Sequence, residues 1–186
     1  MLSSAIVLGP QRRHPIVRTA IDDLVSDRSL PVAVVTAGWE EREDEDEELR
    51  QHVGRPVTNL QVWSRVESIF KKDPELREAV RERHDTWRRV QELYRLRLNG
   101  LMDSTRELLR RGHADPLVAV EELDSWELVC GLDAQHMARV STIHAEFIER
   151  VKPAERETVQ DECRQIEKQL GDAACLLVAG GHVGVL

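Results

Sequence analysis

The sequence predicts an α/β fold in which a partial parallel sheet, of the three-layer Rossmann-like type, carries a long inserted helical hairpin or bundle. One observation is a set of short apolar runs that end at turn residues, a pattern typical of strands covered on both faces. The other is a long stretch whose apolar residues recur at steps of three, four and seven, which is typical of amphipathic helices. We therefore assign residues 1–72 and 172–186 to the α/β part and residues 73–171 to an inserted helical bundle.

Four segments have the length and composition of strands. They are Ala5–Leu8, Val32–Thr36, Val57–Leu60 and Cys175–Ala179. Between the first two, Pro15–Val25 carries apolar residues at helical spacing, which predicts a βαβ unit. Because Cys175–Ala179 is wholly apolar, we expect it to lie inside the sheet, beside the first or the second strand.

Three helices are expected in the insertion. The first starts at Asp73-Pro74, a common helix beginning, and its apolar stripe continues to residue 108. The second covers 120–151, where we expect Gly131 to interrupt it. The third covers 153–171. Helices of this length joined by short loops are expected to pack as an antiparallel bundle.

Charge and composition exclude several classes of function. The net charge is −8, but Glu40–Glu48 alone contributes −7, so the rest of the chain is nearly neutral. Without a broad basic face, general nucleic-acid binding is not expected. No apolar run reaches membrane-spanning length, and the N-terminal run lacks the features of a signal peptide. Three scattered cysteines, Cys130, Cys163 and Cys175, suit small buried side chains in a reducing compartment, so we expect a cytoplasmic protein without a membrane partner.

The candidate site lies at the carboxyl ends of the predicted strands, where parallel sheets bind ligands. Glycine-bearing turns follow three of the strands, and glycine lets a backbone approach a ligand closely. The candidate catalytic residues are Gly180, Gly181 and His182, and the candidate substrate-binding residues are Gly9, Gly38 and Glu40. The alternative is that these are only the tight turns that any parallel sheet needs.

Two charged features allow more than one interpretation. The acidic run Glu40–Glu48 is either a solvated helix start, stabilised by the helix dipole, or an acidic rim that favours cationic substrates. Asp133 and His136, with His144 further along, could place metal ligands on one helix face, but the paired Glu-x-x-His motifs of bundle metal sites are absent. We therefore predict neither a metal nor a cofactor.

The motifs Val-Leu-Gly-Pro (7–10), Val-Ala-Val-Val-Thr-Ala-Gly (32–38) and Leu-Leu-Val-Ala-Gly-Gly-His (176–182) together resemble a known family. They are similar to the start of the class I glutamine amidotransferase-like fold, in the branch that holds cyanophycinase and related serine peptidases. The resemblance implies that the Gly180-Gly181 turn lies beside the nucleophile and helps to form an oxyanion hole. It also implies a serine elbow on a later strand. His182 departs from the Asn or Asp usual in that family.

None of the serines in this chain has the setting of a nucleophile elbow, a strained turn between a strand and a helix flanked by glycines. We therefore expect the N-terminal portion of an amidotransferase-like or peptidase-like hydrolase of amide or peptide bonds, inactive alone and completed by a downstream segment. The alternative is a non-catalytic helical interaction module that forms a homo-oligomer or binds a protein partner.

Overall fold

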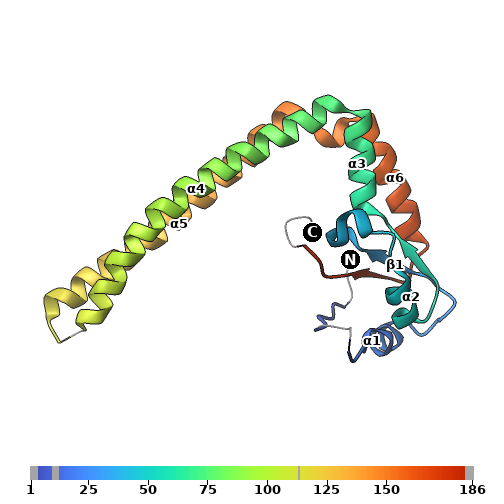
Figure 1. Cartoon of the computed structure of the whole chain (residues 1–186), viewed down its shortest axis with the longest axis horizontal. Coiled ribbons are helices and arrows are strands. Elements are labelled where there is room, and N and C mark those ends of the chain that lie inside the picture. Colours follow the sequence, from blue (N-terminus) through green and yellow to red (C-terminus); the bar gives the residue numbers. More distant parts are fainter. Residues whose placement is uncertain (1–3, 10–12, 113, 183–186) are drawn as a thin grey trace. The chain divides into compact units, whose positions relative to one another are not determined.

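The computed structural model describes residues 4–9, 13–112 and 114–182, which form two compact units (Figure 1). The sheet-bearing unit holds the chain up to Asp73 and again from Ala154 onward. The hairpin unit is Pro74–Pro153. Each unit is described separately below.

The sheet-bearing unit contains three parallel strands in the order β2-β1-β3. They are β1 (Val32–Val35), β2 (Val57–Asn59) and β3 (Cys175–Val178). In the register, Val32 lies opposite Val57 on one side and Cys175 on the other. Three of the four expected strands are thus confirmed, and the last of them does pair with the second.

The strand expected at Ala5–Leu8 is wrong, because the chain forms no regular structure there. Both edges of β1 are already paired, so this run could not join the centre of the sheet. Only Leu8 packs against the core, and Val7 is almost fully exposed. The helix expected after it exists as α1 (Val17–Leu24), but the βαβ unit that it was to complete does not.

The core of this unit is built around β1. Val32 and Val34 are fully buried, as expected for a central strand covered on both faces. They form one cluster with Val17 and Ile21, which are four residues apart and so share one face of α1. The last residue of α2 (Glu47–Val53) completes the cluster.

Helix α6 (Glu157–Gly171) belongs to the sheet-bearing unit, where it runs beside α3 (Val62–Lys72) (Figure 1). Arg65 of α3 donates to the Glu162 carboxylate of α6 over 2.6 Å, and both side chains are largely buried. The compact hairpin unit therefore ends at Pro153, whereas the expected insertion continues to residue 171. The reason is that α6 has its main packing partner in α3 rather than in the hairpin.

A buried carboxylate connects the turn after β1 to α3. That turn begins as the 3₁₀ segment η1 (Ala37–Arg42), and Glu43, which follows it, is only 1% exposed. Its carboxylate accepts from the backbone N–H groups of Trp63 and Ser64 at 3.2 and 3.0 Å. These are the second and third N–H groups of α3, whose own N-cap residue, Gln61, supplies no capping side chain. Glu43 therefore caps α3 from a distant segment.

The acidic run is only partly the solvated surface that its composition indicates. Glu43 and Asp46 are buried, while Glu41, Glu47 and Glu48 are exposed. The buried pair is three residues apart, so both side chains can turn to the same side of the chain. The interpretation of the whole run as a solvated helix start is therefore wrong for these two residues.

The buried Glu43 carboxylate accepts from two N–H groups of α3 that have no other acceptor in the helix. Glu43→Ala should therefore lower the free energy of unfolding by ~1.5–3 kcal/mol, the range for hydrogen bonds to charged groups. Glu43→Gln should lose less, because it keeps one acceptor oxygen. Urea unfolding followed by circular dichroism measures both. The exposed neighbour Glu41 is the control, and Glu41→Ala should change stability by less than ~0.5 kcal/mol. If Glu43→Ala and Glu41→Ala lowered the free energy of unfolding equally, the capping role of Glu43 would be contradicted.

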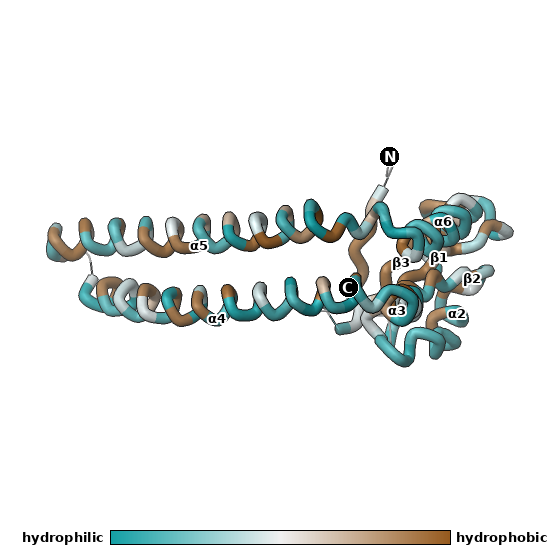
Figure 2. Tube along the Cα trace, turned by 90° about the horizontal axis from the view of Figure 1, so that it is seen from above, coloured by the Kyte–Doolittle hydropathy of each residue, from teal (hydrophilic) through white to brown (hydrophobic). Residues whose placement is uncertain are grey.

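The hairpin unit consists of α4 (Pro74–Arg111) and α5 (Pro116–Val151), which lie side by side and antiparallel (Figures 1 and 2). Both long helices confirm the sequence prediction, but the break at Gly131 does not occur. Glycine in a helix interior costs about 1 kcal/mol relative to alanine. The burial of Val129 and Leu132 on either side of it stabilises the helix by more than that.

Valines recur along the face of α5 that meets α4. Val118, Val129, Val140 and Val151 are spaced by 11 residues, and all four are half-buried or buried. A repeat of 11 residues corresponds to ~3.67 residues per turn, close to the 3.6 of an ideal α-helix. The same face therefore stays directed at α4 along the whole hairpin.

The contact between α4 and α5 also contains a buried polar pair. The hydroxyl groups of Thr105 and Ser125 lie 2.6 Å apart and are buried. The Thr105 hydroxyl also donates to the Leu101 carbonyl at 2.9 Å, so Ser125 is the donor of the pair. Thr105→Val leaves the buried Ser125 hydroxyl without this acceptor and should destabilise the chain by ~1–3 kcal/mol. The double variant Thr105→Val with Ser125→Ala should recover most of that loss, because neither side then needs a hydrogen bond. A double-mutant cycle measured by thermal unfolding checks this, and additive losses would contradict it.

Candidate functional site

The carboxyl edge between β1 and β3 is the place where the strand order reverses. The chain leaves β1 toward β2 and returns past β1 to form β3. In open α/β sheets, ligands bind beyond the carboxyl ends of the strands at such a reversal. The turns that follow β1 and β3 therefore form the candidate site.

The backbones of these two turns lie against each other. Ala179 N–H donates to Val35 C=O at 2.9 Å, and His182 N–H donates to Gly38 C=O at 2.8 Å. A Cβ atom placed on Gly181 would lie 2.4 Å from the Gly38 carbonyl oxygen, which is too close for any side chain. Glycine at position 181 is thus required by the close approach of the two chains.

Two side chains add contacts across the same edge. The indole N–H of Trp39 donates to the Gly180 carbonyl at 2.8 Å. The Nδ1 atom of His182 lies 3.2 Å from an oxygen of Glu40, and both side chains remain partly exposed to solvent. The structure therefore brings Gly38, Glu40 and the segment 180–182 together, as the sequence predicts.

The backbone of Glu40 has an uncommon conformation, with φ 56° and ψ −125°. Few residues other than glycine adopt a positive φ, and such conformations cost about 1–3 kcal/mol and cluster at functional sites. A strained turn between a strand and a helix is also the structure that raises the nucleophile of serine hydrolases above the sheet. Here the residue in the strained position is a carboxylate.

The Nδ1 atom of His182 and the Glu40 carboxylate lie at ion-pair distance. A carboxylate that accepts from Nδ1–H selects the tautomer in which Nε2 carries a lone pair. A histidine held in this way by a carboxylate is the arrangement that activates a hydroxyl in covalent and general-base catalysis. His182 and Glu40 are thus the pair of titratable side chains that lie together at this edge.

Not every expected role agrees with the structure. The His182 N–H, expected to bind an oxyanion, already donates to Gly38. Gly9 follows a segment that is not a strand, so the reason for placing it at this edge no longer holds. Sequence reasoning missed Trp39 in the site, although it stands between Gly38 and Glu40, because its hydrogen-bond acceptor is 141 residues away.

A buried polar network supports the turn after β1. The Asn59 amide nitrogen lies 3.0 Å from the Thr36 hydroxyl, the Glu43 carbonyl and an Asp46 carboxylate oxygen. Arg50 donates to both oxygens of that carboxylate, at 2.6 and 2.8 Å. Burial alone would raise the pKa of Asp46, but the hydrogen bonds from Arg50 and Asn59 and the Arg50 charge outweigh it, so the pKa lies below its ordinary value.

This lowered pKa makes stability depend on pH. A carboxyl group with a depressed pKa in the folded state contributes stability above its unfolded pKa of ~3.9, and this contribution is lost as pH falls through the folded value. We expect Asp46→Asn to be less stable than the wild type by ~1–3 kcal/mol at neutral pH. The difference in unfolding free energy between Asp46→Asn and the wild type should become smaller as the pH is lowered below ~4.

Urea unfolding between neutral and acidic pH measures this difference. Glu48→Gln removes an exposed carboxylate of the same run and should show almost no difference at any pH. A constant gap between Asp46→Asn and the wild type would contradict the assignment.

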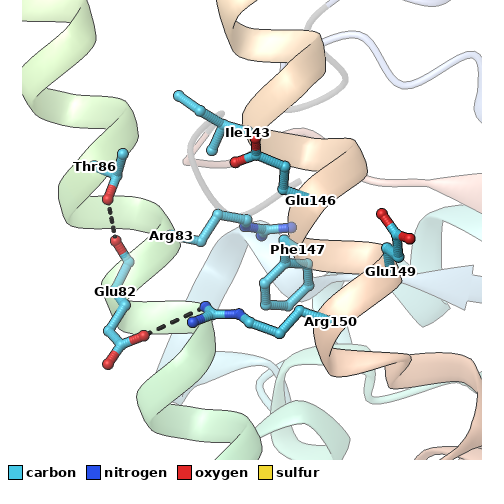
Figure 3. Close-up of a pocket in the computed structure, with 8 residues that line it drawn as sticks. All are labelled: Glu82, Arg83, Thr86, Ile143, Glu146, Phe147, Glu149 and Arg150. Atoms are coloured by element: carbon cyan, nitrogen blue, oxygen red, sulfur yellow. Dashed lines mark hydrogen bonds and ion pairs between the residues drawn. The ribbon is translucent and has the colours of Figure 1, made fainter.

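The hairpin unit has an open groove of about 580 Å³ between α4 and α5 (Figure 3). Its charged groups already interact within the hairpin. The Arg83 guanidinium lies 4.3 Å above the Phe147 ring, and Arg150 lies 3.4 Å from Glu82. The groove is lined by Glu82, Arg83, Thr86, Ile143, Glu146, Phe147, Glu149 and Arg150. We assign it to helix packing.

The residues considered as metal ligands have other roles. The Tyr94 hydroxyl donates to Asp133 at 2.7 Å, and the His136 ring stacks on Tyr94 with centroids 4.1 Å apart. Within residues 4–9, 13–112 and 114–182, no group of three or more potential ligands gathers around a common point. The cysteines also differ from expectation, because Cys130 and Cys163 are exposed.

This chain matches no protein family, and neither a curated protein nor a solved structure is significantly similar to it. The likeness to amidotransferase-like proteins therefore depends on the strand motifs alone. In the described part of the chain, no helix combines the length and the apolar character needed to cross a membrane.

Proposed function

We propose that the β1–β3 edge forms part of an active site that hydrolyses amide or peptide bonds, with His182 as the general base. The observation that carries this proposal is the contact of 3.2 Å between His182 Nδ1 and the Glu40 carboxylate, in which Glu40 occupies a strained strand-to-helix turn. The resemblance of the strand motifs to amidotransferase-like hydrolases supports the same reaction class.

Each group at the edge then has a separate role. His182 Nε2 takes the proton of the attacking hydroxyl, and Glu40 holds the imidazole in place and stabilises the imidazolium that forms. The hydroxyl is that of water or of a serine. We assign the developing oxyanion to the Gly181 N–H, and loss of one such donor costs about 3–4 kcal/mol.

The acidic run adds a preference for charge. Glu41, Glu47 and Glu48 follow Glu40 closely and are exposed. Their negative potential attracts cationic groups and repels anionic ones. The proposed substrates are therefore amides or peptides with basic side chains near the bond that is cleaved.

The test uses the natural full-length protein and two sets of fluorogenic peptides, one basic and one acidic. His182→Ala should lower kcat/KM by ~100-fold or more, the usual contribution of a general base. Glu40→Ala should give a smaller but clear loss. Glu167→Gln, a change of an exposed carboxylate on α6 outside the acidic run, is the matched control and should stay within about twofold, since an exposed charge contributes little.

Hydrolysis that His182→Ala leaves unchanged would show that the base lies elsewhere. Absence of hydrolysis of both peptide sets by the wild-type protein would count against the reaction class. Gly181 is a poor position for this test, because any side chain there meets the Gly38 backbone and displaces the edge itself.

A further inference from the structure

A small cavity lies between the middle parts of α4 and α5, which run side by side (Figure 2). Its volume is about 10 Å³, which is room for one water molecule or one oxygen atom of a larger ligand. Val90 and Leu132 form the aliphatic part of its wall. The other side chains around it are Tyr94, Arg97, Gln135, His136 and Arg139.

The imidazole of His136 is held in place, but one of its nitrogens has no partner. The ring stacks on the Tyr94 ring, with centroids 4.1 Å apart and 15° between the two planes. The Tyr94 hydroxyl donates to Asp133 at 2.7 Å, which holds the tyrosine as well. The Nδ1 atom of His136 is buried and has no hydrogen-bond partner among the residues that the structure describes. A buried polar atom of this kind indicates a water or an ion that completes its hydrogen bonding.

The charges around the cavity favour an anion over a water molecule. Arg97 of α4 and Arg139 of α5 line it from opposite helices, and both side chains are exposed. Within the described ranges, neither arginine forms an ion pair or a hydrogen bond. No acidic residue lines the cavity, and the Asp133 carboxylate accepts from Tyr94. Guanidinium groups bind oxyanions strongly, because several N–H donors carry the charge.

The number of donor groups favours a phosphate over a carboxylate. Each guanidinium can donate two parallel N–H groups to an oxyanion, and the imidazole adds one donor. A carboxylate has too few oxygens for all three groups, whereas the oxygens of a phosphate point in tetrahedral directions. One oxygen can then enter the cavity while the others remain outside with the arginines.

We propose that this cavity is a phosphate-binding site, in which one phosphate oxygen accepts from His136 Nδ1–H and the others accept from Arg97 and Arg139. The site is formed by α4 and α5 of a single hairpin. The inference does not depend on the proposed hydrolase function, which concerns the sheet-bearing unit.

The test is the binding of inorganic phosphate to the full chain at constant ionic strength. Calorimetry measures the affinity, and the imidazole NMR signals of the histidines locate the ligand. We expect saturable binding that shifts the signals of His136. The signals of His52 and His84, which lie outside the cavity, should not change.

Variants identify the groups that bind phosphate. His136→Phe keeps a ring on Tyr94 but removes the nitrogen donor, and Arg97→Gln or Arg139→Gln removes one guanidinium. Each should weaken binding by ~10-fold or more, because a hydrogen bond between charged groups contributes about this much. Arg77→Gln is the matched control, because Arg77 is an exposed arginine of α4 that does not line the cavity. It should bind phosphate as the wild type does.

Circular dichroism of every variant checks that the helices remain folded. Arg97 and Arg139 are exposed, so their variants test the site even if His136→Phe does not fold. Arg97→Lys keeps the charge without the planar pair of donors and should bind more tightly than Arg97→Gln but less tightly than the wild type.

Two further probes identify the kind of ligand. If methyl phosphate binds as tightly as inorganic phosphate, the site accepts the phosphate group of a small molecule. If only inorganic phosphate binds, the site accepts the free ion. Acetate, which has fewer oxygens, should bind ~10-fold more weakly or less.

Three results would overturn the proposal. One is the absence of saturable phosphate binding, as expected if Nδ1 contacts only a water molecule. Another is a loss of affinity in Arg77→Gln as large as in Arg97→Gln, which would indicate attraction by net charge alone. The third is binding that the folded variants His136→Phe and Arg97→Gln leave unchanged, or acetate binding as tight as that of phosphate.

Discussion

The sheet-bearing unit depends on the position of β1 between two parallel partners. Because β1 is paired on both edges and covered on both faces, its residues are all apolar, and Val32, Ala33 and Val34 are fully buried. The register that pairs Val32 with both Val57 and Cys175 also brings the chain ends of β1 and β3 to the same edge. The contact of Gly38 with Gly181 and the Glu40–His182 pair are consequences of that register, although about 140 residues separate the two turns.

The strained turn at Glu40 is held by the buried groups that follow it. A residue in such a conformation persists only where its surroundings determine it strongly. Glu43 provides this by capping α3, and Asp46 provides it through Arg50 and Asn59. Glu43 and Asp46 belong to an acidic run whose composition indicates a solvated surface, but both are buried and stabilise the geometry of the site. Stability and the proposed chemistry share these residues, so variants in this turn need a measurement of unfolding beside any measurement of activity.

The hairpin follows a different principle. The contact between α4 and α5 is formed by valines at intervals of 11 residues and by the hydrogen bond between the Thr105 and Ser125 hydroxyl groups. Outside this contact, Trp126, Met137 and Ile148 of α5 remain exposed.

The sequence by itself determined the local elements, namely three of the strands and the two long helices, and also the meeting of the two glycine turns that follow β1 and β3. Apolar runs and helical spacing are local properties, so they can be read without knowledge of contacts. The tertiary structure alone decided that Ala5–Leu8 is not a strand, because the edges of β1 were occupied by segments far along the chain. It also decided that Gly131 does not interrupt α5 and that α6 packs on α3. The burial of Glu43 was also decided by the tertiary structure. Its carboxylate accepts from N–H groups about 20 residues away, and no local pattern in the sequence reveals this contact.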